Sequence, residues 1–222
     1  MSKDQWEPLV LVSQSPRRRE LLALTGLTFE VQAGDIDETQ HSGEDPEAYV
    51  RRMAREKALT GSQMASGRTV LAADTIVVDG DQILGKPPNR EAAERMLRYL
   101  RSREHVVMTA VAYQSTASKG VEVELCRTQV PMRPYSDAEL TQYLDSGDSL
   151  DKAGGYGIQN EGFHPVENLH GCYANVMGLP LCHLTRMLVS LGQSVPRDVS
   201  TACQKFTNYD CPVFESILNG QL

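Results

Sequence analysis

The chain has 222 residues, of which 41% are hydrophobic and 23% are charged, and its formal net charge is −7. This length and apolar share allow a packed core in one large α/β domain or in two small ones. The acidic balance disfavours binding to nucleic acid or to an anionic membrane surface. A small anionic substrate stays compatible with it, provided that a few arginines and lysines are concentrated in one cleft.

The cysteine pattern and the lack of long apolar runs bear on the compartment. The five cysteines are odd in number and show no C-x-x-C spacing, which argues against a disulfide framework and a zinc ribbon. The apolar run after Pro8 is too short for the core of a signal peptide, and no stretch approaches the roughly 20 apolar residues of a membrane-spanning helix. We therefore expect a cytoplasmic protein without a membrane or nucleic-acid partner.

The first predicted unit is a strand followed by a helix. The apolar run 9–12 predicts the strand, Ser15 is a candidate N-cap, and Pro16 suits the first helical position. A helix N-terminus beside a strand end offers unpaired N–H groups and a positive dipole end, and Arg17 and Arg18 add donors suited to phosphate oxygens. These features indicate an anion site, although a capped helix with solvated arginines fits the segment equally well.

A β-hairpin is predicted next. The β-prone run 70–78 is followed by Asp79-Gly80, a favoured hairpin dipeptide, and the return strand would bring Lys86 back toward Asp74. An aspartate inside a strand is costly to bury unless it is paired or binds a metal. We therefore predict a functional role for Asp74, either as a metal ligand or as a base that deprotonates water. The structural alternative is a turn residue at the strand end.

Glu38 and Lys57 carry weaker signals. Glu38 lies in an acidic loop, where side chains usually face solvent. Lys57 comes late in a helix that begins after Asp45, and three arginines near it make a solvated helix face the default interpretation. The residues alone assign no chemistry to either side chain.

The second half of the chain continues the alternation of helices and strands. A helix is predicted over 89–101, two long antiparallel strands over 106–113 and 121–130, and a further helix after the capping box that starts at Ser136. The glycine-rich segment 151–159 would let the backbone approach a ligand closely, unless it is an ordinary turn.

The order of elements predicts the fold class and the domain organisation. Helices and strands in mixed order indicate an α/β fold, with a mixed twisted sheet flanked by helices and two lobes around a cleft. The ordered pattern ends with a leucine-rich helix over 180–192, which closes a domain over residues 1–193. Residues 194–222 are polar and aperiodic, and we expect them to form a loosely attached extension.

Taken together, segments 13–18, 73–87 and 151–159 resemble the Maf family of nucleoside triphosphate pyrophosphatases, which shares a fold with the inosine triphosphatase group. The match runs in order from about Leu9 to Leu191. The resemblance implies hydrolysis between the α and β phosphates of a nucleoside triphosphate, giving a monophosphate and pyrophosphate. It also implies a divalent cation, magnesium or manganese, and a homodimer.

The resemblance assigns roles to individual residues. Asp74 corresponds to the proposed proton acceptor, and Glu38 to the acidic position in the loop, so both could hold the metal. Both roles of Asp74 need the same ionised carboxylate, and the sequence leaves them open. The phosphate-binding positions correspond to Ser13, Arg18, Lys57 and Lys86, and the neighbouring hydroxyl of Ser15 is a further candidate for substrate binding.

Three further positions sort substrate preference within the family, and here they are Arg17, Thr75 and Gln159. All three match the branch that acts on dTTP and UTP, which could include modified pyrimidine nucleotides. Thr75 and Gln159 have the hydrogen-bonding groups to read a pyrimidine edge. Asn160-Glu161 departs from the small residues usual beside this pocket. The alternatives are a 7-methylguanosine triphosphate pyrophosphatase and a nucleotide-binding regulator of septation that does not need turnover.

Overall fold

The computed structural model describes residues 9–117 and 120–221, so the first eight residues of the predicted domain and the last residue of the extension lie outside it. Its centre is a mixed sheet in the order β2-β1-β3-β5-β6, with β4 paired to β3. Strand β1 runs parallel to β2 and β3, whereas β3, β5 and β6 are antiparallel neighbours. The strands are β1 Leu9–Val12, β2 Phe29–Gln32, β3 Val70–Asp79, β4 Gln82–Leu84, β5 Glu104–Gln114 and β6 Glu122–Pro131.

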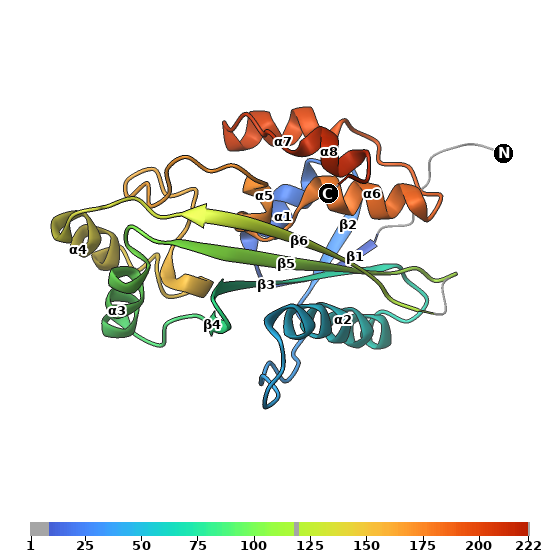
Figure 1. The fold of residues 1–222 in the computed structure, drawn as a ribbon. Coiled ribbons are helices and arrows are strands. Elements are labelled where there is room, and N and C mark those ends of the chain that lie inside the picture. The colour runs from blue at the N-terminus through green and yellow to red at the C-terminus, as the bar shows by residue number, and fades with distance from the viewer. Residues whose placement is uncertain (1–8, 118–119, 222) are drawn as a thin grey trace.

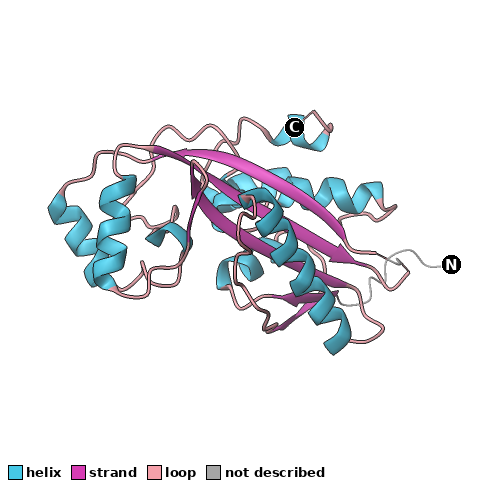
Figure 2. Ribbon diagram, turned by 60° about the horizontal axis from the view of Figure 1, so that its bottom comes forward, coloured by secondary structure: helices cyan, strands magenta, loops and turns pink. Residues whose placement is uncertain are grey.

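Helices cover both faces of this sheet, which confirms the predicted α/β fold (Figure 1). Helix α2 covers one face, and α1, α5 and α6 cover the other. Helices α3 and α4 lie together near the start of β5 and the end of β6 (Figures 1 and 2). None of the described helices combines the length and hydropathy needed to cross a membrane. The helices are α1 Pro16–Ala23, α2 Pro46–Met64, α3 Arg90–Leu100, α4 Asp137–Asp145, the 3-10 helix η1 Ala153–Gly155, α5 Tyr173–Met177, α6 Leu181–Ser190, α7 Val199–Thr207 and α8 Phe214–Leu218.

The helix starts follow local capping chemistry. Asp45 accepts hydrogen bonds from two N–H groups of the first turn of α2, and Ser136 forms the predicted capping box at α4. At α1, Pro16 takes the first position as predicted, but the Ser15 side chain makes no capping bond. The Ser15 N–H instead donates to Ser13 Oγ at 3.1 Å. The turn before α1 is therefore closed by Ser13.

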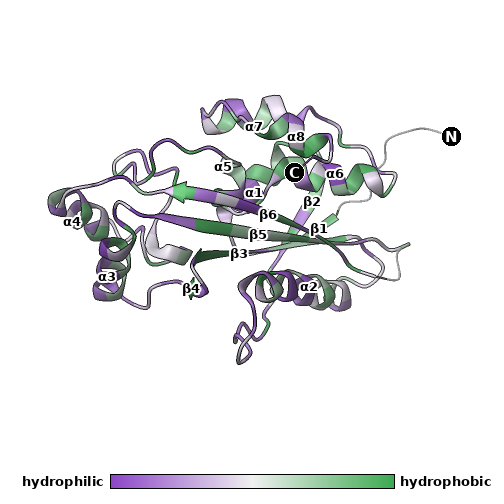
Figure 3. Ribbon diagram, in the orientation of Figure 1, coloured by the Kyte–Doolittle hydropathy of each residue, from purple (hydrophilic) through white to green (hydrophobic). Residues whose placement is uncertain are grey.

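Strand β3 has two apolar faces. Asp74 interrupts one of them and Thr75 interrupts the other. Leu71, Ala73 and Val77 pack into the core beneath α1 and α5, while the residues alternating with them pack against α2. Hydrophobic residues predominate along much of β3 and β5 (Figure 3). By this alternation Asp74 points toward α2 and Thr75 points to the opposite face. One dipeptide thus supplies polar groups to both sides of the sheet.

The register of the sheet leaves one edge of β3 unpaired over part of its length. Strand β1 pairs with β3 only as far as Val12 opposite Ala72, and β4 pairs with it from Val77 onward. On the other side, β5 pairs with β3 without interruption. Residues 73–76 therefore have a neighbouring strand on one edge alone among the described strands.

The C-terminal extension differs from the expectation of loose attachment. Helices α7 and α8 both pack on α6, and their side chains Val199 and Ile217 are buried. Asp198 caps α7 by accepting hydrogen bonds from two N–H groups of its first turn. The helices have only nine and five residues, which is too short for a clear apolar period to emerge from the sequence.

The close approach of α2 to the sheet depends on Gly61, and we expect Gly61→Ala to destabilise the fold. A Cβ there would lie 2.2 Å from Val12 Cγ2 and 3.1 Å from Val70 Cγ1. The gain in helix propensity is about 1 kcal/mol, whereas overpacking typically costs about 1–3 kcal/mol, so a net loss of unfolding free energy should appear in urea titrations. A control is Gly120→Ala, whose Cβ would meet no atom of the described residues within 4 Å. Equal stability of both variants would contradict this account.

Candidate functional site

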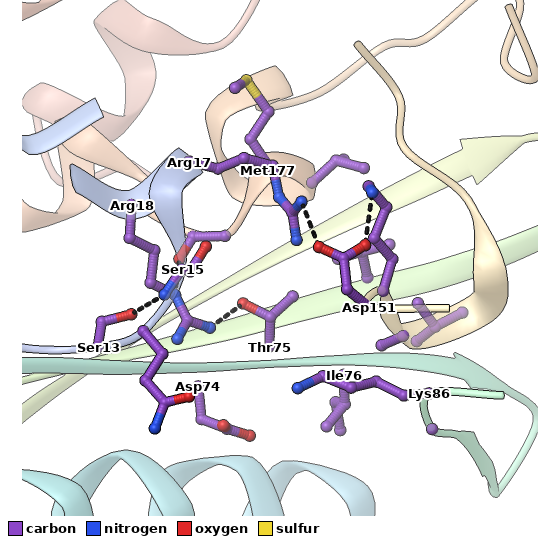
Figure 4. A pocket seen from close by; sticks show the side chains of 18 of the residues that line it. Ser13, Ser15, Arg17, Arg18, Asp74, Thr75, Ile76, Lys86, Asp151 and Met177 are labelled. Atoms are coloured by element: carbon purple, nitrogen blue, oxygen red, sulfur yellow. Dashed lines mark hydrogen bonds and ion pairs between the residues drawn. The ribbon is translucent and has the colours of Figure 1, made fainter. Parts of the chain in front are cut away.

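A cleft of about 720 Å³ lies beside the part of β3 that has a strand on only one edge. Its walls come from the start of α1, the loop before α2, α2 itself, the turn after β4, the segment around η1 and the end of α5. Figure 4 shows several of these side chains pointing toward one another. The structure brings together every site residue predicted from the sequence: Ser13, Ser15, Arg17, Arg18, Glu38, Lys57, Asp74, Thr75, Lys86 and Gln159.

The ammonium of Lys57 bridges the two acidic residues of the cleft. Its Nζ lies 2.6 Å from Asp74 Oδ1 and 2.7 Å from Glu38 Oε1. The Lys57 and Asp74 side chains are each only 13% exposed, whereas Glu38 is 58% exposed. The default interpretation of Lys57 as a solvated helix residue is therefore wrong, and the buried Asp74 carboxylate has the partner that its position in a strand requires.

Helical spacing explains why Lys57 points inward. The face of α2 that packs on the sheet includes Val50, Ala54, Ala58 and Gly61. Lys57 lies seven residues after Val50 and four before Gly61, so it belongs to the same stripe. This periodicity was the sequence signal for a buried lysine, and the neighbouring arginines obscured it.

Glu38 is held over the cleft by Tyr49, a residue that sequence reasoning did not assign to the site. The Tyr49 hydroxyl donates to the Glu38 carbonyl oxygen at 2.8 Å. Burial, with the nearby charges of Asp74 and Glu38, raises the pKa of Tyr49 to about 12, so this hydroxyl stays a donor. Burial alone would raise the pKa of Glu38, but the hydrogen bond and charge of Lys57, with Lys86 and Arg18, lower it overall. Glu38 is therefore ionised at neutral pH.

On the other face of β3, a chain of hydrogen bonds orients Arg18. Its Nε donates to the Gly178 carbonyl oxygen at 2.9 Å. Its Nη2 donates to Thr75 Oγ1, also at 2.9 Å (Figure 4). Thr75 Oγ1 also lies 2.9 Å from Thr109 Oγ1, and the Thr109 hydroxyl donates to the Asn175 carbonyl oxygen. Because Thr109 has only one hydroxyl proton, Thr75 must donate to it.

This direction of hydrogen bonding limits what Thr75 can do. Its proton is committed to Thr109, and one lone pair already accepts from Arg18. Thr75 in this arrangement can offer a substrate an acceptor but not a donor. Burial lowers the pKa of Arg18 and the charge of Asp74 opposes that effect, yet a guanidinium stays protonated in proteins. Thr75 thus acts mainly by aiming a fixed positive charge into the cleft.

Arg17 is held by a second network that includes Lys152, another residue missed from the sequence. Arg17 Nη1 lies 3.4 Å from Asp151 Oδ2, and Lys152 Nζ lies 2.6 Å from Asp151 Oδ1 (Figure 4). Burial would raise the pKa of Asp151, but the hydrogen bond and charge of Lys152, together with Arg17, lower it overall. Lys152 also donates to Asp148. Arg17 is therefore tied to the segment that carries Gln159.

Two glycines of segment 151–159 are required by the backbone conformation and the packing of this segment. Gly154 and Gly155 have φ values of +74° and +73°, a region that favours glycine. A Cβ on Gly154 would lie 3.0 Å from Val77 Cγ2 on β3. The Gly154 N–H also donates to the Gly85 carbonyl oxygen at 3.2 Å, which ties this segment to the turn of Lys86. Gly154 thus allows a close approach to β3, and the close approach of this segment to a ligand stays a prediction.

His105 supports the same segment from inside the core. Its Nε2 and the hydroxyl of Tyr156, which lines the cleft, share a hydrogen bond of 2.7 Å. His105 is only 2% exposed, and burial lowers its pKa to about 4 against an opposing effect of Asp79. The imidazole is therefore neutral at physiological pH and fixes Tyr156 without adding charge to the cleft.

The donor set is compatible with magnesium or manganese. Mg²⁺ is usually bound through one or two carboxylates together with substrate phosphates and water. Asp74 and Glu38 already direct one oxygen each at a single cation, the Lys57 ammonium. Within the described residues, no group of three or more histidine, cysteine, aspartate or glutamate side chains is arranged to hold a metal. The two carboxylates would thus need oxygens from a ligand to complete a metal site.

Acidification should remove the stability that the neutral, buried His105 gives to the fold. Because the folded pKa of about 4 lies below the unfolded value near 6.5, the unfolded chain binds more protons between these values. The unfolding free energy should fall by roughly 3 kcal/mol through His105 as the pH falls from about 6.5 to about 4. His105→Gln should lose correspondingly less stability over this range, and the imidazole should titrate near pH 4 by NMR. An identical pH dependence in both proteins would contradict the assignment.

Comparison with known proteins places these features in a family. The model of the Maf family, described as Maf-like protein, matches residues 8–191. A dTTP/UTP pyrophosphatase of Myxococcus xanthus (strain DK1622) is 47% identical over 188 residues, which cover 85% of this chain and 94% of that protein. A dTTP/UTP pyrophosphatase of Anaeromyxobacter dehalogenans (strain 2CP-1 / ATCC BAA-258) is 47% identical over 190 residues, covering 85% of this chain and 96% of that protein.

A solved nucleoside-triphosphatase / dITP/XTP pyrophosphatase from Mycobacterium abscessus aligns with 86% of this chain and 100% of its own, at 15% identity and a TM-score of 0.41. This similarity is too low to carry an argument, and the fold class rests on the strand order described above. The family match covers the cleft residues from Ser13 to Gly178. The chain belongs to the Maf family.

Proposed function

We propose that this protein is a nucleoside triphosphate pyrophosphatase that hydrolyses dTTP and UTP to the monophosphate and pyrophosphate. The observation that carries the proposal is that Arg18, Lys57 and Lys86 line one cleft together with Asp74, whose carboxylate pairs with Lys57. The choice of substrate is supported by relatives that are 40–47% identical and named dTTP/UTP pyrophosphatase. A triphosphate is the kind of anion that such a cluster of cations would attract.

In this proposal the positive side chains bind and polarise the triphosphate. Arg18 is held by Gly178 and Thr75, which leaves its remaining N–H groups for phosphate oxygens. Lys86 lies at the opposite wall, where the turn after β4 is tied to η1. Fixed charges on two walls would hold the phosphate chain in one orientation and stabilise the charge that develops during cleavage.

Asp74 is the residue that accepts the proton of the attacking water. It lies on the rigid central strand, and its carboxylate faces the cleft. A magnesium or manganese ion held by Asp74 and Glu38 would neutralise charge on the phosphate oxygens and lower the pKa of water bound to it. Both roles require an ionised Asp74 carboxylate, and Lys57 lies 2.6 Å from one of its oxygens.

Arg17 and Gln159 are the side chains that we assign to recognition of the pyrimidine base of the nucleotide. Both line the cleft, and Asp151 ties Arg17 to the segment of Gln159. An arginine donates and a glutamine side chain both donates and accepts, so together they can match a pyrimidine edge. The proposal also includes a homodimer in the cytoplasm, which analytical ultracentrifugation and cell fractionation would test.

A pyrophosphate-release screen tests the substrate. With Mg²⁺ or Mn²⁺ present, we expect dTTP and UTP to be hydrolysed faster than CTP and 7-methylguanosine triphosphate, because relatives that are 40–47% identical are named dTTP/UTP pyrophosphatase. Preference for 7-methylguanosine triphosphate would move the protein to the other branch. Tight nucleotide binding without pyrophosphate release would instead favour the role of a binding-only regulator.

Asp74→Asn tests the mechanism. The amide keeps the shape of the side chain but cannot accept the proton, so kcat should fall by about 10²- to 10⁴-fold while the circular dichroism spectrum stays unchanged. Asp81→Asn is the matched control, because Asp81 lies exposed in the turn between β3 and β4 and should keep its activity. Pyrophosphate release by Asp74→Asn at the wild-type rate would refute the role of Asp74.

A further inference from the structure

The cation position between Asp74 and Glu38 is taken by a side chain of the protein itself. Lys57 Nζ lies within 2.7 Å of an oxygen of each carboxylate. These are the two residues that the proposed function assigns to the divalent metal. One ammonium therefore neutralises the same two oxygens that a metal ion would need.

The surrounding charges make this position unfavourable for a bare cation. Five basic side chains and four carboxylates line the cleft, so its formal charge without nucleotide is 5 − 4 = +1. Lys86 and Arg18 line the same cleft as Asp74 and Glu38. A divalent ion that entered alone would have to displace Lys57 and also approach these two cations. The charged residues that line the cleft are Arg17, Arg18, Asp35, Glu38, Lys57, Asp74, Lys86, Asp151 and Lys152.

A nucleoside triphosphate would change this balance. Its phosphate oxygens offer Lys57 an alternative partner and offer the metal the ligands that two carboxylates do not supply. Lys57 can reach such a partner because its ammonium sits at the end of a flexible four-carbon stem, while the helix carrying it stays packed through Ala58 and Gly61.

We propose that Lys57 is an internal counter-ion that occupies the cation position of the free protein, so that the divalent metal enters with the nucleotide and not before it. The true substrate is then a metal–nucleotide complex. Lys57 has two successive partners: the carboxylates Asp74 and Glu38 in the free protein, and a phosphate group in the complex. This inference rests on the proposed function for the identity of the nucleotide, but not for the competition between Lys57 and metal.

Manganese binding without nucleotide tests the competition directly. Free Mn²⁺ measured by EPR should show weak binding to the wild-type protein and binding at least about tenfold tighter to Lys57→Met, which removes the ammonium but keeps the length of the side chain. Lys57→Gln provides a second variant in case the first does not fold. Adding Asp74→Asn to either variant should abolish the gain. Unchanged Mn²⁺ affinity in folded Lys57 variants would overturn the proposal.

Lys86→Met separates occupancy from general electrostatics. It removes one positive charge from the same cleft, but no ion pair joins Lys86 to Asp74 in the described part of the chain. We expect it to tighten Mn²⁺ binding much less than Lys57→Met does. Equal tightening by both variants would show that overall positive potential weakens metal binding, and would overturn the assignment to Lys57.

A non-hydrolysable dTTP analogue with a methylene group between the α and β phosphates tests the order of binding. We expect the wild-type protein to bind Mn²⁺ at least about tenfold tighter with this analogue than without it, and Lys57→Met to show a smaller gain. Equal Mn²⁺ affinity with and without the analogue would overturn the proposal. Failure of the proposed function would appear separately, as absence of pyrophosphate release in the substrate screen.

Discussion

The ion pair between Lys57 and Asp74 is the interaction on which the cleft depends. An ionised carboxylate in the middle of a buried strand is tolerated only if a partner reaches it, and Lys57 does so at 2.6 Å. That partner comes from the helix packed on the same face of the sheet, so the charge pair and the apolar contacts of α2 require one another. Loss of either would leave a charged group facing an apolar surface.

Because side chains alternate along β3, this one strand supplies residues to the cleft walls on both faces of the sheet. Asp74 faces α2, where the carboxylates meet Lys57, and Thr75 faces the α1 and α5 side, where it orients Arg18. Both residues are set by the same rigid backbone. The Asp74 carboxylate and the Thr75 hydroxyl that orients Arg18 are therefore positioned relative to each other by adjacent residues of one strand.

Much of the fold and site could be predicted because the signals were local. Asp45, Ser136 and the Asp79-Gly80 turn acted through nearby backbone groups, so their effect was readable without tertiary context. Lys57 and Lys152 were harder, since a lysine pattern does not say which carboxylate it will meet. The direction of the Thr75 hydrogen bond depends on Thr109 and Asn175, far away along the chain. The short helices of the extension needed α6 as a packing surface.

The interrupted pairing of β3 affects how the affinity for a nucleotide can be divided among residues by mutation. Between Ala72 and Val77, main-chain groups on the edge away from β5 face the cleft without a described strand beside them. Buried or partly buried N–H and C=O groups need water or a ligand as partner. Any nucleotide contact made there belongs to the backbone and survives every side-chain substitution. Alanine scanning of the cleft would therefore miss such contacts, and amide-to-ester replacement would test for them at those positions of 73–76 whose N–H groups point away from β5.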